Sequence, residues 1–200
     1  MIRILIAEDQ ALVRGAISAL LSLSGEVDVV AEAENGKQAI ALINEHQPDM
    51  VLTDIEMPEM TGIEVVEHMA EHHPNIQSVI MTTFSRAGYI KRAINAGVKG
   101  FILKEAPSDY LLQALKSIQQ GKKVIDPELA ISALDDNDPL TDKERKALRL
   151  AGDGLKTSDI AAKLFLSEGT VRNYLSEAIA KLNAANRIDA ARIAQQKGWL

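Results

Sequence analysis

Apolar and polar positions in the first 120 residues follow two patterns that take turns along the chain. Short apolar runs, which predict buried strands, are separated by stretches where apolar residues recur every three or four positions, as in helices. Strands that alternate with helices form parallel βαβ units. We therefore expect a five-stranded, doubly wound, flavodoxin-like parallel sheet. The predicted strands are Ile2 to Ala7, Val27 to Ala31, Met50 to Leu52, Ile76 to Met81 and Phe101 to Leu103.

The helices between these strands are predicted from the same spacing and from residues that begin or end helices. In the first helix Leu12, Ala16, Leu20 and Leu21 lie near one face, which predicts a side turned toward the sheet. Ser108 is placed to cap the last helix of this half, because a serine hydroxyl can accept a hydrogen bond from an early helical N–H.

Residues 138–200 show only the helical pattern and predict four short helices. Thr141 followed by Glu144 is a capping box, which marks a helix start. Ser167 is expected to cap a longer helix in which Val171, Leu175 and Ala178 recur at core spacing. A tight turn before that helix predicts a helix-turn-helix arrangement.

The stretch 121–137 has a different character and is predicted to be a linker, with one helical turn around Leu129 to Leu134. It contains Asp126-Pro127 and ends in acidic, Asn-containing text, which is typical of linkers and turns. The expected organisation is therefore residues 1–120, a linker at 121–137, and residues 138–200.

Composition narrows the class of protein. Two hundred residues suffice for two modest domains, and the chain has no cysteine, which excludes disulfides and thiolate ligands. The apolar runs are shorter than the roughly 18 residues that cross a bilayer, and the N-terminus becomes acidic too early for a secretion signal. We expect a cytoplasmic protein with no membrane insertion.

Charge is divided unevenly between the two halves. Residues 1–137 carry 11 basic and 20 acidic side chains, and residues 138–200 carry 11 basic and 8 acidic ones. The net charges are therefore −9 and +3. This asymmetry indicates that only the second half approaches a polyanion, although so small an excess does not establish nucleic-acid binding by itself.

Polar side chains follow four of the predicted strands at their carboxyl ends. Taken singly, each has an ordinary explanation as a helix cap, a strand end or a solvated charge. Taken together they meet at one edge of a parallel sheet, where ligands bind. Clustered carboxylates repel unless a cation joins them, and an all-oxygen set favours Mg²⁺. The residues are Glu8, Asp9, Asp54, Thr82 and Lys104.

Carboxylates, Mg²⁺, a hydroxyl and an ammonium group together are suited to phosphoryl transfer onto an aspartate. Asp54 would attack phosphorus, while Lys104 would pair with the transferred group. The Thr82 hydroxyl would hydrogen-bond one of the phosphoryl oxygens.

With these residues in this order, residues 1–120 resemble the receiver domains of bacterial two-component response regulators. The matching text is Glu8-Asp9, Asp54 to Pro58 with Gly62, Thr82 and Lys104. The resemblance implies that Asp54 is the phosphoacceptor, that Glu8 and Asp9 bind Mg²⁺, and that Glu56 lends its backbone carbonyl to the metal. It also implies that Phe101 is an aromatic residue that turns inward on activation. Thr83 departs from the pattern, since a small alanine is common there.

Residues 138–200 resemble the LuxR-type helix-turn-helix domain of the NarL/FixJ response regulators. The matching text includes Leu140 to Glu144, Ser167 to Tyr174, Lys181-Leu182 and Asn186-Arg187. Tyr174 and Ser176 depart from the usual residues of the family. The resemblance implies base contacts by Arg172 and Asn173, with Thr170 and Ser176 nearer the DNA backbone. It also implies a dimer contact by the last helix, for which Ile188, Ala191 and Arg192 are the candidates.

The predicted function is a transcriptional regulator switched by phosphorylation of Asp54, with Mg²⁺, a sensor histidine kinase and double-stranded promoter DNA as partners. Phosphorylation would favour a homodimer that reads two half-sites. The protein is not expected to be an enzyme beyond its own phosphoryl transfer and slow self-dephosphorylation. Alternatives from other classes are an aspartyl-phosphate hydrolase, a phosphorylation-independent regulator and a receiver-based protein-interaction adaptor.

Overall fold

The computed structural model describes residues 1–83, 87–134 and 138–200 of the chain. The chain divides into two compact units, one formed mainly by the chain up to Leu134 and the other mainly by the remainder. The last residues of the predicted linker, 135–137, lie outside the described residues. Each unit is taken below by itself.

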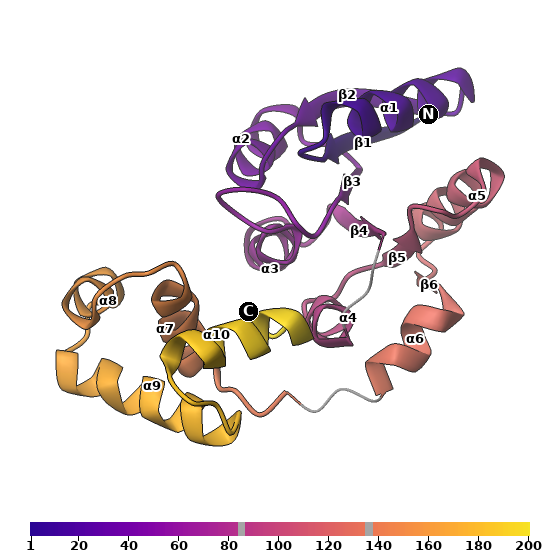
Figure 1. Cartoon of the computed structure of the whole chain (residues 1–200). Helices are drawn as coiled ribbons and strands as arrows, with labels where there is room; N and C mark the ends of the chain where they lie inside the picture. The colour runs from indigo at the N-terminus through magenta and orange to yellow at the C-terminus, as the bar shows by residue number, and fades with distance from the viewer. Residues whose placement is uncertain (84–86, 135–137) are drawn as a thin grey trace. The chain divides into compact units, whose positions relative to one another are not determined.

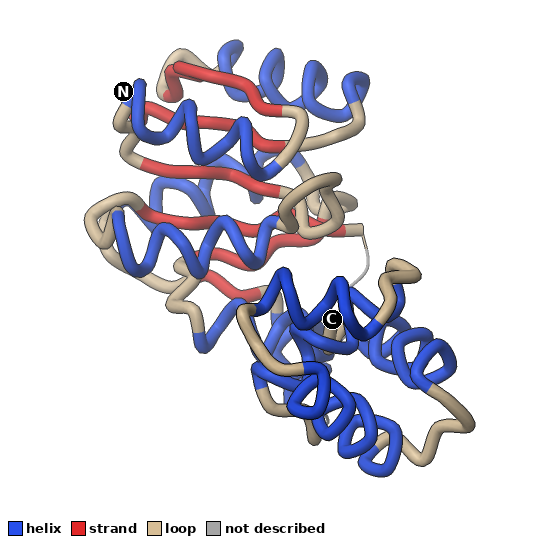
Figure 2. Tube along the Cα trace, turned by 90° about the vertical axis from the view of Figure 1, so that its left-hand side faces the viewer, coloured by secondary structure: helices blue, strands red, loops and turns tan. Residues whose placement is uncertain are grey.

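The first unit is built on a parallel sheet (Figure 2), as the strand pattern predicts. In the described residues the sheet has six strands in the order β2-β1-β3-β4-β5-β6, and every neighbouring pair is parallel. The doubly wound order places the carboxyl ends of β1 and β3 side by side. The strands are β1 (Ile2–Ala7), β2 (Val27–Ala33), β3 (Met50–Thr53), β4 (Gln77–Thr82), β5 (Gly100–Leu103) and β6 (Val124–Ile125).

The sixth strand lies inside the segment predicted to be a linker, so the prediction of five strands was one too few. The Val124 N–H donates to the Lys99 carbonyl at 2.9 Å, and the Asp126 N–H donates to the Phe101 carbonyl at 3.0 Å. The helix that follows, α6 (Pro127–Leu134), is longer than the single turn expected. These bonds extend the sheet past β5, and the buried Leu129 side chain of α6 joins the core around Phe101.

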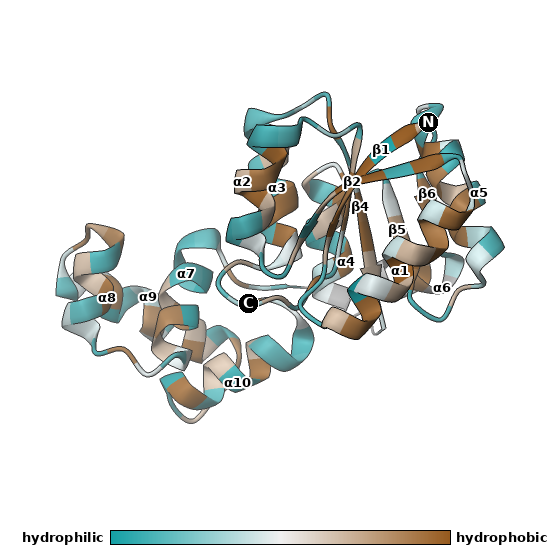
Figure 3. Cartoon of the chain, turned by 90° about the horizontal axis from the view of Figure 1, so that it is seen from above, coloured by the Kyte–Doolittle hydropathy of each residue, from teal (hydrophilic) through white to brown (hydrophobic). Residues whose placement is uncertain are grey.

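Five further helices cover the two faces of the sheet (Figure 1). Helices α1 and α5 lie on one face, where Leu21 and Leu115 pack with Ile4 of β1. Helices α2, α3 and α4 lie on the other face, and their apolar sides turn toward the strands (Figure 3). The helices are α1 (Ala11–Leu23), α2 (Gly36–His46), α3 (Gly62–His72), α4 (Ala87–Asn95) and α5 (Ser108–Gln119).

Two local expectations in this unit were wrong. Leu12 is 87% exposed and Ala16 is exposed too, because the buried face of α1 is centred on Leu21. Ser108 is the first residue of α5 rather than its cap, since Pro107 occupies the cap position and no side chain bonds the helix start. Proline fits there because it needs no N–H partner.

The second unit consists of four helices over its described residues, as predicted. They are α7 (Asp142–Gly152), α8 (Thr157–Leu164), α9 (Glu168–Lys181) and α10 (Arg187–Lys197). The predicted capping box is confirmed, because the Thr141 hydroxyl accepts from the Glu144 N–H while the Glu144 carboxylate accepts from the Thr141 N–H. Val171, Leu175 and Ala178 are buried in the core of this unit, which fixes the direction that α9 faces.

Candidate functional sites

The carboxyl ends of β1 and β3 bring three carboxylates together. Glu8, Asp9 and Asp54 each offer an oxygen atom, and these atoms lie within 4.8 Å of one another. Asp54 follows β3 and is held against β1 by a hydrogen bond from its N–H to the Ala7 carbonyl at 2.8 Å. Pairing between two neighbouring strands therefore places the acidic cluster, hereafter the acidic pocket.

Lys104 contacts two members of the acidic pocket. Its Nζ atom lies 2.7 Å from Glu8 Oε2 and 3.1 Å from Asp54 Oδ2. Burial alone would lower the pKa of Lys104, but the bonds to Glu8 and Asp54 outweigh burial and raise this pKa. The Lys104 N–H donates to the Thr82 carbonyl at 2.8 Å, which joins the ends of β4 and β5 beside the pocket.

The charge on Asp54 is unfavourable in the folded chain. Its side chain is buried, and burial followed by the nearby charge of Glu8 raises the pKa above the ordinary value, against the opposing effect of Lys104. One ammonium group faces three carboxylates, so the described pocket is short of positive charge. A divalent cation would supply the missing charge.

The donor set of the pocket fits Mg²⁺. Carboxylate oxygens are hard ligands, and Mg²⁺ is commonly held by one or two carboxylates together with water. Asp9 is exposed while Glu8 and Asp54 are buried, so the cluster is open to solvent on one side. Glu56, whose carbonyl is the expected further ligand, follows closely after Asp54 and is also exposed.

Gly62 explains how the backbone around Asp54 can pack so tightly. A Cβ atom at this position would lie 1.8 Å from the Asp54 carbonyl oxygen. The Gly62 N–H also donates to the Ile55 carbonyl at 2.9 Å, and Ile55 in turn donates its N–H to Asp54 Oδ1 at 2.8 Å. The start of α3 and the loop after β3 therefore hold the backbone and the carboxylate of Asp54 in place.

The remaining predicted residues of this half lie at the ends of β4 and β5. The Thr82 side chain is buried at the end of its strand, and the neighbouring Thr83 is exposed. Phe101 is already fully buried, opposite Ile80 on one side and Ile125 of β6 on the other. An inward turn of Phe101 therefore has no exposed starting position here, because Ile125 of β6 and Leu129 of α6 pack in the core around the ring.

Sequence reasoning missed Arg14 as a neighbour of the acidic pocket. Its guanidinium Nη1 donates to the Glu8 carbonyl at 2.6 Å, and its Nε lies 3.5 Å from Glu32 on β2. The i to i+6 separation of Glu8 and Arg14 spans a strand end and a helix start, so no helical or strand spacing predicts the contact.

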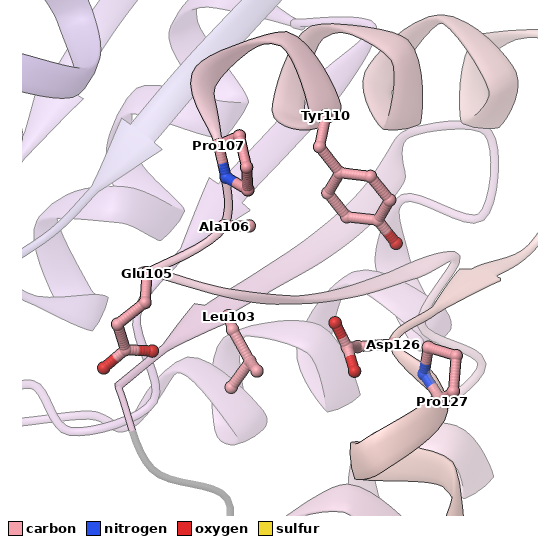
Figure 4. Close-up of a pocket in the computed structure, with 7 residues that line it drawn as sticks. All are labelled: Leu103, Glu105, Ala106, Pro107, Tyr110, Asp126 and Pro127. Atoms are coloured by element: carbon pink, nitrogen blue, oxygen red, sulfur yellow. The ribbon is translucent and has the colours of Figure 1, made fainter.

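A separate cavity of about 280 Å³ opens beside the segment that follows Lys104 (Figure 4). The Tyr110 ring and the Asp126 carboxylate extend into this region from α5 and from the end of β6, whereas the Glu105 carboxylate points away from them. None of the acidic-pocket residues lines the cavity.

The second site is the exposed face of α9. Ser167 caps the helix as predicted, because its hydroxyl accepts from the Thr170 N–H at 3.1 Å. Arg172, Asn173 and Ser176 are exposed on one side of the helix, and Thr170 is partly exposed. Arg172 is paired with Glu168 at 2.8 Å in the structure. The turn before α9 also exposes Phe165, whose side chain is 95% accessible.

An ion pair between a partly exposed lysine and a buried carboxylate holds α9 against α7. Lys181 Nζ lies 2.8 Å from both carboxylate oxygens of Glu144, whose residue is 1% exposed. Burial alone would raise the pKa of Glu144, but hydrogen bonds from Lys181 and Thr141 outweigh it and lower this pKa. Sequence reasoning used Glu144 only as a capping residue and missed that it also positions α9.

The three candidates for a dimer contact on α10 differ in exposure. Ile188 is 52% exposed, and Arg192 is exposed and paired with Asp189 at 2.8 Å. Ala191 is 4% exposed and packs in the core of the helical unit, because α10 turns its alanines toward α7. Ala191 is therefore not part of the exposed face of α10.

Comparison with known families matches both units. Residues 4–116 match the response regulator receiver domain, and residues 138–194 match the LuxR family of bacterial regulatory proteins. The receiver match alone covers more than half of the chain, so the protein belongs to the two-component response regulators and carries a LuxR-type DNA-binding domain. This is a family of transcriptional regulators rather than of classical enzymes.

Individual relatives extend over the full chain. It is 45% identical over 200 residues to the uncharacterized transcriptional regulatory protein YvfU of Bacillus subtilis, covering all of both chains. It is 43% identical over 199 residues to the transcriptional regulatory protein DesR of the same organism, covering 100% of this chain and 99% of that one. The crystal structure of the response regulator ChrA from a heme-sensing two-component system matches with a TM-score of 0.59 at 32% identity. The match covers 100% of this chain and 98% of that chain.

Among the described residues, no helix combines the length and the apolar character that a membrane span requires.

Proposed function

We propose that Asp54 accepts a phosphoryl group from a partner sensor histidine kinase, and that this modification favours a homodimer whose α9 helices bind promoter DNA. The observation that carries the proposal is the buried Asp54 carboxylate, whose pKa is raised and which shares one pocket with Glu8, Asp9 and Lys104. Such a carboxylate is costly to the fold and is explained best by chemistry that needs it.

The chemistry assigned to the pocket is a single phosphoryl transfer. An Asp54 carboxylate oxygen forms a bond to phosphorus while the bond from phosphorus to the donor's imidazole nitrogen breaks, and the donor keeps that electron pair. Lys104 Nζ, 3.1 Å from Asp54, would pair with the oxygens of the transferred group. Thr82 is the last residue of the neighbouring strand β4, and its hydroxyl would hydrogen-bond one of these oxygens. Glu8, Asp9, Asp54 and the Glu56 carbonyl would hold Mg²⁺, which when bound neutralises charge on the phosphoryl oxygens.

The proposed switch follows from this transfer. A phosphorylated Asp54 carries more negative charge than the carboxylate, which draws Lys104 away from Glu8. The backbone after Lys104 lines the cavity of about 280 Å³, so its movement changes the surface formed by the ends of β5, β6 and α5. Because Phe101 is already buried, we assign the movement to the segment after Lys104 rather than to an inward turn of that ring.

The first experiment treats the full-length protein with a small-molecule phosphodonor and Mg²⁺ and follows phosphorylation on phosphate-affinity gels and by intact mass. Wild type is expected to gain one phosphoryl group, whereas Asp54→Asn gains none. Asp28→Asn is the matched control, because Asp28 is exposed on β2 and is expected to behave as wild type. Equal phosphorylation of wild type and Asp54→Asn would overturn the proposal.

The second experiment tests dimerisation by sedimentation of the same samples. Phosphodonor is expected to convert wild type, but not Asp54→Asn, from monomer to dimer. Ile188→Glu and Arg192→Glu alter the exposed face of α10 without entering the core, and we expect both to weaken the dimer that phosphodonor induces. An Asp54→Asn protein that dimerises as readily as wild type would count against the switch.

The third experiment tests DNA recognition by α9. Arg172→Ala is expected to weaken specific promoter binding about 10-fold or more, since a bidentate contact to guanine is worth about 1–3 kcal/mol. Lys197→Ala removes an equal charge from the exposed end of α10 and should change affinity by no more than about twofold. Binding that is insensitive to salt in both proteins would contradict contact with DNA phosphates.

A further inference from the structure

Three of the four histidines of the chain lie together at the C-terminal end of α3, away from the sites described above. The rings of His68 and His72 are stacked, with centroids 4.1 Å apart and an angle of 14° between their planes. The ring of His73 lies 6.2 Å from that of His68. Because α3 rises about 1.5 Å per residue, His68 and His72 lie about 9 Å and about 15 Å along the helix from Gly62, which packs behind Asp54.

The stacking follows from helix geometry and brings two nitrogen donors to one face. Residues four apart lie one above the other on a helix, so the imidazoles of His68 and His72 project side by side. Burial, and then the neighbouring imidazoles, lower the pKa of His68. A neutral imidazole offers a lone pair, which a metal ion requires.

The hydrogen bond of His72 fixes which of its nitrogens carries that lone pair. Its Nδ1 lies 3.0 Å from the His68 backbone carbonyl. A carbonyl oxygen can only accept, so Nδ1 carries the proton and donates it, which leaves the lone pair of the neutral ring on Nε2. Metal-binding histidines are commonly held in this way, by a bond from the second ring nitrogen to a backbone carbonyl.

From this geometry we infer that His68 and His72, joined by His73, form a binding site for a divalent transition metal such as Zn²⁺, Ni²⁺ or Cu²⁺. Imidazole donors suit these ions, whereas the oxygen donors of the acidic pocket suit Mg²⁺. Zinc holds nitrogen ligands at about 2.0–2.1 Å, so the coordinating nitrogens would stand about 3.3 Å apart. Side-chain rotations that unstack the two rings would bring their nitrogens to that spacing, and a larger rotation would bring in His73.

The site would tie the last turn of α3 to the residue that ends the helix. His72 is the last residue of α3, and His73 is its C-cap, whose backbone N–H donates to the Met69 carbonyl at 2.8 Å. A metal bound across this junction holds the α3 end and the turn into β4 together. It is expected to stabilise the receiver unit by mass action, independently of Asp54.

The test measures Zn²⁺ binding to the full-length protein by titration calorimetry, in excess Mg²⁺ so that the acidic pocket is occupied. We expect one Zn²⁺ per chain, an affinity at least 10-fold weaker in His68→Gln/His72→Gln, and a smaller loss in His73→Gln. His46→Gln is the matched control, because His46 is the one histidine outside the cluster, and it should bind as wild type. Asp54→Asn should also keep the site, which separates this inference from the proposed phosphorylation.

A second measurement uses the unaltered protein, so that it does not depend on how the variants fold. Paramagnetic Cu²⁺ is added in small amounts, and the histidine ring signals are followed by nuclear magnetic resonance. The signals of His68, His72 and His73 should broaden first, while those of His46 stay sharp. Equal broadening of all four histidines, or equal Zn²⁺ affinity of wild type and the double variant, would overturn the inference.

Discussion

Each unit of the protein contains a buried carboxylate paired with a lysine, and the two pairs are held in opposite ways. In the receiver unit Lys104 lies 3.1 Å from Asp54 but must also pair with Glu8 at 2.7 Å. In the helical unit Lys181 lies 2.8 Å from both oxygens of Glu144. The pKa of Asp54 is raised, whereas the pKa of Glu144 is lowered.

The two carboxylates differ in their partners and in their surroundings. Glu144 is 1% exposed and Asp54 is 8% exposed, but the lysine that pairs with Glu144 is itself 34% exposed, and burial is the largest cause of the raised pKa of Asp54. Glu144 receives hydrogen bonds from Lys181 and from the Thr141 N–H, and these outweigh desolvation. Asp54 shares its lysine with a second carboxylate. A buried charge with its own partners stabilises a fold, and one without enough partners indicates a site for chemistry.

The largest effect is expected from Gly62→Ala, which disturbs the backbone packing that holds Asp54 in place. In Gly62→Ala the added Cβ would lie 1.8 Å from the Asp54 carbonyl, so the loop after β3 must shift. We expect the free energy of unfolding to fall by about 3 kcal/mol and the rate of phosphorylation by phosphodonor to fall at least about 10-fold. Urea unfolding and phosphate-affinity gels measure the two effects.

Gly15→Ala is the matched control for this prediction. Apart from the neighbouring residues and the backbone of α1 itself, no atom lies within 4 Å of the Cβ that it adds, and alanine is favoured over glycine in a helix by up to about 1 kcal/mol. Its stability should therefore rise slightly, with phosphorylation unchanged. If Gly62→Ala behaved in the same way, close backbone packing would not be what positions Asp54.

The next effect tests whether Glu144 is held by its own partners. Glu144→Gln keeps the shape of the side chain but removes the negative charge, to which Lys181 and the Thr141 N–H donate hydrogen bonds. We therefore expect the free energy of unfolding of the helical unit to fall by about 2 kcal/mol. Trp199 is the only tryptophan of the chain and packs against the core of this unit, so its fluorescence follows the transition.

Glu168→Gln is the control for Glu144→Gln within the same unit. It also breaks a carboxylate–cation pair, with Arg172 at 2.8 Å, but this pair is exposed on α9. Exposed pairs of this spacing contribute about 0.3–0.5 kcal/mol. Equal destabilisation by the two substitutions would mean that burial of Glu144 does not set the strength of its pair.

The residues of the acidic pocket could be predicted because each follows a strand that an apolar run in the sequence predicts. The run Ile2 to Ala7 is the observed β1, and Met50 to Leu52 lacks only Thr53 of β3. Parallel pairing does the rest, since it brings the ends of these strands to one edge. Spacing along the sequence could not show that the pocket is short of positive charge, because the Lys104 side chain reaches Glu8 from the end of β5, and two strands separate β5 from β1.

The elements that were missed depend on tertiary contacts rather than on local pattern. Val124 and Ile125 form a strand of two residues between lysines and Asp126-Pro127, too short for any periodicity. This strand exists because the free edge of β5 offers the carbonyls of Lys99 and Phe101. Ala191 likewise gives no strong local indication of burial, because alanine is small and weakly apolar, and it is buried only because α10 packs this side against α7.

A third prediction concerns the sign of the Asp54 effect on stability. Asp54→Asn removes the charge that is repelled by Glu8 and desolvated by burial, so the free energy of unfolding should rise by about 1 kcal/mol, while phosphorylation is lost. The exposed Asp28→Asn should change stability by less than about 0.5 kcal/mol. Far-UV circular dichroism during urea unfolding measures both proteins. A destabilised Asp54→Asn would show that Lys104 compensates Asp54 fully.

The smallest expected effect is on how the stability changes caused by Asp54→Asn and Glu144→Gln depend on pH. The contribution of Asp54 to stability and that of Glu144 change in opposite directions as the pH falls. The pKa of Asp54 is raised above its ordinary value of 3.8, so the folded chain binds this proton more readily than the unfolded chain does. Its destabilising effect is therefore complete above the folded pKa and disappears as pH falls toward 3.8. The stability gained by Asp54→Asn should shrink over this range.

The contribution of Glu144 to the free energy of unfolding has the opposite sign. Its pKa is lowered below the ordinary value of 4.5, so its stabilising effect is present above pH 4.5 and is lost as pH falls through the folded pKa. The loss caused by Glu144→Gln should therefore be constant from neutral pH down to about 4.5 and shrink only below it. Unfolding of both variants and wild type in a pH series measures the two slopes. If the Asp54→Asn difference grew on acidification, the pocket would hold a satisfied carboxylate like Glu144, and the contrast between the two pairs would fail.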